Sequence, residues 1–141
     1  MLHYFNLNLK TENEMRKVTE QISNALINGK KKTVGNTSTD GSSMFLHGNE
    51  IIKSFTIIDG YKLNWIHFNL RSDCTNGLPS STTRERLNGF LDSKFPDCGF
   101  SFGQKNWTAV IHGYKDGKHV YKNIPDDQWL SFSFLSDLFN N

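Results

Sequence analysis

The chain has 141 residues, a formal net charge of +2 and an aromatic content of 13%. This length suits one domain with its own apolar core, and the aromatic content argues against a disordered chain, because large rings supply much of the burial energy. The mild net charge does not by itself indicate a nucleic-acid-binding protein, so any electrostatic argument has to come from local clusters.

The cysteines and the N-terminal segment exclude several classes of protein. Cys74 and Cys98 are too few for a disulfide framework and lack the spacing of zinc ligands. The first ten residues lack the basic and continuous apolar segments of a secretory signal, and no apolar run is long enough to cross a membrane. We therefore expect a cytoplasmic protein without a membrane partner, a cofactor or a metal site.

The N-terminal third contains a predicted strand, a helix and a loop. Residues 2–9 alternate loosely between apolar and polar side chains, as an edge strand does. Thr11 and Glu14 have the spacing of a capping box, which predicts a helix over residues 11–29 with a glycine at its end. Residues 35–43 are rich in Gly, Ser and Thr, and we expect them to form a loop between this helix and a sheet.

Residues 44–70 are predicted to form strands joined by tight turns. Asp59-Gly60 has the composition of a two-residue hairpin turn, which would pair Ile58 with Tyr61. This register predicts a core face and an opposite, mixed face. The predicted core face carries Ile51, Phe55, Ile57, Ile66 and Phe68.

The mixed face of this hairpin is a candidate binding surface. It includes Tyr61, Trp65 and His67, whose rings could stack on a base or a nucleotide. The same rings could instead receive the apolar stripe of the N-terminal helix, and we favour that interpretation.

A central helix is predicted over residues 81–94, and its first turns carry the most distinctive polar sequence of the chain. Free backbone amides and the positive end of the helix dipole favour anions there. Two arginines could bind a phosphate or a carboxylate, with threonine hydroxyls as further donors. The alternative is an ordinary capped helix in which Glu85 and Asp92 neutralise the arginines. The candidate ligand-binding residues are Thr82, Thr83, Arg84, Arg86 and Asn88, together with Trp65 and Tyr61.

Residues 100–122 are predicted to form further strands, because Asp116-Gly117 is a strong hairpin signal. His112 and His119 fall on one face and could act as general acid and base or as metal ligands, although no third ligand lies at a suggestive spacing. We favour packing of cross-strand rings, and these histidines are the candidates for catalysis. A short helix over residues 126–139 follows. The face of the predicted 100–122 strands that holds both histidines carries Val110, His112, Tyr114, His119 and Tyr121.

Three short motifs together resemble a group of small bacteriophage proteins. In that group a Leu-His strand leads into a hairpin, a Thr-Thr-x-x-Arg-Ile/Leu-Asn helix follows, and a strand pair has Gln or Tyr near Trp. The similarity covers residues 34–112, but the group usually closes its hairpin with Gly-Trp, which this chain lacks. It implies a phage origin and no particular activity. The matching segments are Asn36-Thr37, Leu46-His47-Gly48-Asn49, residues 82–88, Gln104 and Trp107.

These observations predict one α+β domain over residues 1–141. It should contain a bent antiparallel sheet of about five to seven strands with an N-terminal, a central and a short C-terminal helix. We expect a non-enzymatic phage accessory protein, for host takeover or anti-defence, that binds a host protein or nucleic acid in the host cytoplasm. The alternatives are a sponge that sequesters a nucleotide, and a small nuclease or phosphoesterase using His112 and His119. The sequence leaves the oligomeric state open.

Overall fold

The computed structural model describes residues 2–57, 63–70 and 78–141, with side chains for residues 14–54, 66–70 and 78–141. The helices are α1 (Leu2–Ile27), α2 (Ser81–Lys94) and α3 (Phe132–Asn140). One antiparallel sheet has the strand order β1 (Lys32–Val34), β2 (Thr37–Thr39), β3 (Ser43–Leu46), β4 (Asn49–Ile57), β5 (Leu63–Asn69) and β9 (Trp129–Ser131). A second antiparallel sheet consists of β6 (Ser101–Lys105), β7 (Thr108–Lys115) and β8 (Lys118–Asn123). The predicted α+β class is confirmed, and the strands divide between two sheets.

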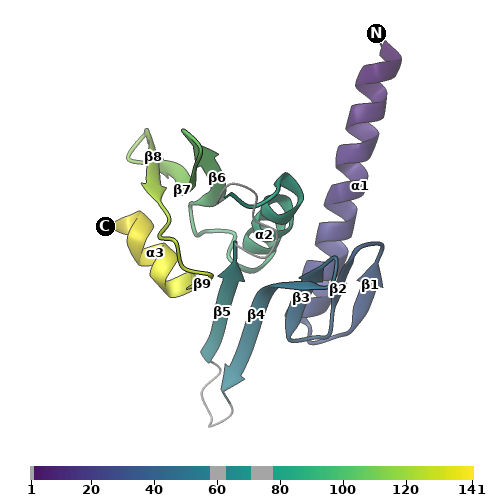
Figure 1. The fold of residues 1–141 in the computed structure, drawn as a ribbon, viewed down its shortest axis with the longest axis horizontal. Helices are drawn as coiled ribbons and strands as arrows, with labels where there is room; N and C mark the ends of the chain where they lie inside the picture. The colour runs from purple at the N-terminus through teal and green to yellow at the C-terminus, as the bar shows by residue number, and fades with distance from the viewer. Residues whose placement is uncertain (1, 58–62, 71–77) are drawn as a thin grey trace.

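The first helix is longer than predicted. It begins at Leu2, so the edge strand expected over residues 2–9 is wrong. The loose alternation there hides a second pattern, because Leu2, Phe5 and Leu9 recur at helical spacing. The C-terminal half of α1 packs on α2 and on β1–β3, whereas its N-terminal half extends beyond the other elements (Figure 1).

The central helix α2 lies between α1 and β6 (Figure 1). Its bounds are those predicted, and Leu87, Phe90 and Leu91 are buried as expected. Gly89 lets the two helices approach closely, because a Cβ at this position would lie 2.0 Å from Thr19 Cγ2. The glycine therefore has a packing role that its low helix propensity does not suggest.

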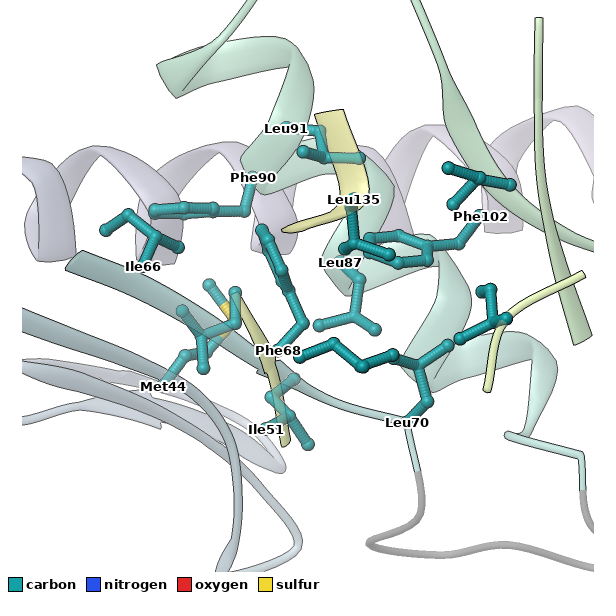
Figure 2. Packing of buried hydrophobic residues seen from close by; sticks show 14 of the residues in the cluster. Met44, Ile51, Ile66, Phe68, Leu70, Leu87, Phe90, Leu91, Phe102 and Leu135 are labelled. Carbon is teal, nitrogen blue, oxygen red and sulfur yellow. The ribbon is translucent and has the colours of Figure 1, made fainter. Parts of the chain in front are cut away.

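One apolar core joins both sheets and all three helices. Phe68 of β5 points into its centre, close to Leu87 and Phe90 of α2 (Figure 2). The Phe68 ring meets the Phe102 ring of β6 edge-on at 5.2 Å between centroids, a favourable aromatic geometry. The chain is therefore a single packed unit.

The register of the β4–β5 hairpin differs from the prediction by one residue. Ile52 pairs with Phe68 and Ile57 pairs with Leu63, which leaves five residues between the last described pair. The predicted Ile58–Tyr61 pair and the Asp59-Gly60 turn lie outside the described part of the chain. The described pairs are shifted by one residue from the register that such a two-residue turn would continue.

This shift changes the predicted face of β4, because a one-residue slip moves every side chain to the other side of a strand. Ile52, not Ile51, shares a face with Ile66 and Phe68. Both isoleucines are fully buried, so their apolar character did not distinguish the two faces.

Two further elements were predicted with the wrong type. The expected loop over residues 35–43 contains β2, which pairs with β1 and β3 and buries Thr37 and Thr39, because β-branched threonines suit strands. The expected helix over residues 126–139 begins as β9, whose hydrogen bonds to β5 compete successfully with helix formation. Helix α3 then starts after Ser131, whose side chain accepts a hydrogen bond from Phe134 N. No helix in the described ranges has a stretch long and apolar enough to cross a membrane.

Candidate functional site

The β6–β7–β8 sheet has one face in the core and one face toward solvent. Phe102 and Ile111 are buried on the inner face. Asp116-Gly117 forms the predicted two-residue turn, with φ values of 54° and 79° and Lys115 paired with Lys118. This register confirms the predicted grouping of rings on one face. We call this surface the outer face, and its charged and aromatic-ring residues include Lys105, His112, Tyr114, His119 and Tyr121.

The rings of the outer face form a continuous row. His119 and Tyr121 stack at 4.5 Å between centroids with an interplanar angle of 3°, and Tyr114 contacts His119 at 4.8 Å. Lys105 Nζ lies 3.8 Å from the centroid of the Tyr121 ring, within cation–π range. Tyr114 is 74% exposed and Tyr121 is 40% exposed, so the row remains accessible from outside.

The two candidate catalytic histidines contact each other directly. His112 Nδ1 and His119 Nε2 lie 3.0 Å apart, so one ring nitrogen donates to the other. Gly103 makes room for this arrangement, because a Cβ there would lie 2.8 Å from His112 Cδ2 and Nε2. Burial, and then the neighbouring His119, lowers the pKa of His112 from its ordinary value. The neutral form of His112 is therefore favoured near pH 7.

This geometry has consequences for acid–base chemistry. A general acid and a general base for phosphoryl transfer act on the leaving and attacking oxygens, which are roughly in line on opposite sides of the phosphorus. Two imidazoles that hydrogen-bond to each other leave no room for a phosphate between them. Among the described residues, no group of three or more His, Cys, Asp or Glu side chains is placed to hold a metal ion.

The start of α2 places its candidate residues mainly against the protein itself. Arg86 is only 4% exposed. Its Nε donates to Thr37 Oγ1 at 3.0 Å, and its Nη1 donates to Thr19 Oγ1 at 2.8 Å and also pairs with Glu85. These contacts join α2 to β2 and α1, and they occupy donors that an external anion would need.

Thr83 and Asn88 also have partners inside the fold. Thr83 is fully buried, and its backbone N–H donates to the Oγ of the capping residue Ser80 at 3.1 Å. Asn88 forms two hydrogen bonds with the backbone of Phe102 in β6. Thr82 and Arg84 are half-buried.

A groove of about 960 Å³ between α1 and α2 contains the Arg84 side chain. Arg84 Nε is buried and has no hydrogen-bond partner among the described residues. Two guanidinium groups in this groove face three carboxylates, so the groove does not concentrate positive charge. The charged residues that line it are Arg16, Glu20, Arg84, Glu85 and Asp92.

The candidate rings of the first hairpin are only partly described. Tyr61 lies outside the described residues, and for Trp65 only the backbone, paired with Phe55, is described. His67 is half-buried, and burial followed by the charge of Lys53 lowers its pKa. The strongest cluster of accessible rings is therefore on the outer face of β6–β8. Lys105 was missed in the sequence, although its alternation with Gly103 places it on this face.

Comparison with known proteins gives one match. The model of a protein family described as Kyanoviridae Gp96 protein matches residues 15–133, from the middle of α1 to the beginning of α3. This match confirms the predicted likeness to small phage proteins, whereas the predicted Thr-Thr-x-x-Arg-Leu-Asn pattern stays a prediction. No curated protein and no solved structure matches the chain.

Proposed function

The chain belongs to the Kyanoviridae Gp96 protein family, and we propose that this phage protein binds single-stranded nucleic acid through the outer face of β6–β8. The observation that carries this proposal is the accessible row of Lys105, Tyr121, His119 and Tyr114. Proteins that bind single strands combine exposed aromatic rings, on which bases stack, with cations that contact the phosphates. The protein would act in the host cytoplasm as a non-enzymatic accessory factor.

The three-stranded sheet as a whole carries positive charge. Residues 101–123 contain four lysines and one aspartate, a formal net charge of +3 in a chain whose total is +2. The strand register places Lys105 on the outer face, whereas Lys115, Lys118 and Lys122 fall on the opposite face. Lys115 Nζ donates to the Asn140 carbonyl at 2.6 Å, while Lys118 is exposed at the end of the β7–β8 hairpin. Lys105 is therefore the lysine that would contact a strand on the outer face, and a lysine there increases affinity by releasing counterions from the phosphate backbone.

The outer face favours unpaired bases over a duplex. Rings can stack on a base only where the base is not already covered by its neighbours in a double helix. A host protein is the second class of partner expected from the sequence, since tyrosines are also common in protein interfaces. The direct contact between His112 and His119 favours binding without hydrolysis.

The proposal is tested by fluorescence anisotropy with labelled single-stranded DNA, single-stranded RNA and duplex DNA. We expect the protein to prefer single strands, with affinity falling as salt rises. Replacement Tyr121→Ala should weaken binding by roughly 5-fold to 100-fold, as loss of one stacking contact does. Phe134→Ala on α3 is the matched control, because Phe134 is similarly exposed, at 43%, but lies outside the outer face. Equal binding by both variants, or a preference for duplex, would contradict the proposal.

A further inference from the structure

The turn between β6 and β7 has an unusual residue. Lys105 pairs with Thr108, so that Asn106 and Trp107 form a two-residue hairpin turn. Both turn residues have left-handed backbones, with φ values of 52° and 62°. Asn and Gly are the residues that adopt this conformation readily, whereas a large side chain is disfavoured there. Trp107 therefore occupies a position where a glycine would be more stable.

Burial of the Trp107 side chain within the fold does not offset the energetic cost of this strained backbone. It is 84% exposed, the highest value among the exposed large apolar side chains of the described residues. No ring of the described residues stacks on it. Since backbone strain of this kind is concentrated at functional sites, an exposed tryptophan in a strained turn indicates a role in binding.

We propose that Trp107 stacks on a base of the nucleic-acid strand bound by the outer face, so that the ligand is an oligonucleotide and not a mononucleotide. This inference rests on the proposed function. Lys105 connects the two regions, because it is adjacent to the turn in the β6–β7 ladder and its Nζ lies over the Tyr121 ring.

The distance along β7 between Trp107 and Tyr114 determines how many nucleotides the ligand needs to reach both rings. Trp107 immediately precedes β7 and Tyr114 lies near its end, seven residues further along. At about 3.3 Å per residue, this separates their backbones by about 23 Å. A stacked strand that advances about 3.4 Å per nucleotide would need roughly seven nucleotides to span this distance, and a more extended strand would need fewer. A single nucleotide cannot reach both rings.

The inference is tested with a length series of thymidine and uridine oligonucleotides, from two to ten nucleotides, and with the mononucleotides. The wild type should gain affinity with length up to about seven nucleotides. Trp107→Gly should reduce affinity for the long oligomers by at least fivefold and should abolish most of the gain in affinity with length. The same variant should have a higher melting temperature, because glycine removes the strain in the turn. Trp107→Phe, which keeps a ring, should recover most of the lost affinity.

The outcomes distinguish this inference from the proposed function. If Trp107→Gly binds every length as the wild type does, while Tyr121→Ala binds more weakly, the role of Trp107 is wrong and the proposed function stands. A wild type that binds mononucleotides as tightly as long oligomers also overturns the inference. If the wild type binds no oligonucleotide of either kind, both proposals fail.

Discussion

The side-chain amide of Asn88 forms two hydrogen bonds with the backbone of Phe102. Its Oδ1 accepts from Phe102 N at 2.7 Å, and its Nδ2 donates to Phe102 O at 3.0 Å. This pair attaches the middle of α2 to the first strand of the sheet that carries the outer face. A residue of the phage-like helix pattern therefore helps to hold the candidate interface in place.

Replacement Asn88→Ala should destabilise the protein by about 1–3 kcal/mol, because it leaves a partly buried N–H and C=O of Phe102 without partners. The free energy of unfolding in urea measures this. Ser93→Ala is the control, since Ser93 is exposed on the same helix. An Asn88→Ala protein as stable as the control would show that the two hydrogen bonds contribute nothing.

Replacement Arg86→Ala should cost about 1–3 kcal/mol of stability, the usual effect of leaving buried polar groups without partners. The loss arises because the buried Thr37 hydroxyl and the half-buried Glu85 carboxylate lose a partner. Arg84→Ala, at a half-buried position two residues away, should cost much less. If Arg86→Ala instead kept full stability and lost nucleic-acid affinity, the anion site predicted from the sequence would be correct.

Replacement Gly89→Ala should also destabilise the protein, although alanine favours a helix over glycine by up to about 1 kcal/mol. The new Cβ would lie 2.0 Å from Thr19 Cγ2, and helix backbones cannot separate without disturbing the core. The double variant with Thr19→Ser, which removes that methyl group and keeps the hydroxyl, should recover stability. A double-mutant cycle from melting curves measures the coupling free energy between positions 19 and 89. A coupling near zero would contradict the close approach of α1 and α2 at Gly89.

The stability of the fold should decrease in mild acid partly through His112. Its pKa is lowered in the folded state, so that between this value and the ordinary value of 6.5 the unfolded chain binds more protons. The contribution of neutral His112 to the free energy of unfolding is therefore complete above pH 6.5. It is lost as the pH falls toward the lowered pKa of His112 in the folded state. Melting temperatures at pH 7.5 and 5.5 should differ more in the wild type than in His112→Gln. Because the pKa of His67 is also lowered and His67 is present in both proteins, the difference isolates His112.

Local sequence signals predicted some elements well and others poorly, for physical reasons. The Asp116-Gly117 turn and the α2 bounds followed from turn chemistry and helix spacing over a few residues. The β4–β5 register inferred from Asp59-Gly60 was wrong by one residue in the described pairs, because Ile51 and Ile52 are both apolar and buried and so do not distinguish the two faces. Local patterns cannot reveal which partner a residue will meet.

The prediction of site residues was limited in the same way, because local sequence does not show which distant residues a side chain will contact. The two arginines at the start of α2 look alike in the sequence, but Arg86 meets Thr37, which is 49 residues away, and becomes buried. The outer face was predicted correctly because a hairpin register determines it. The strain at Trp107 was not foreseen, since a tryptophan in a strand-like sequence does not indicate a left-handed turn.

The central claim is that a nucleic-acid strand lies on the outer face of β6–β8. A ¹H–¹⁵N correlation spectrum of the labelled protein, titrated with an eight-nucleotide single strand of DNA or RNA, tests it most directly. We expect the largest shift changes at the amides of Lys105, His112, His119 and Tyr121, while the signals of the buried Ile22 and Ile51 stay in place. Saturable changes confined to the groove between α1 and α2, or no change at any concentration, would contradict it.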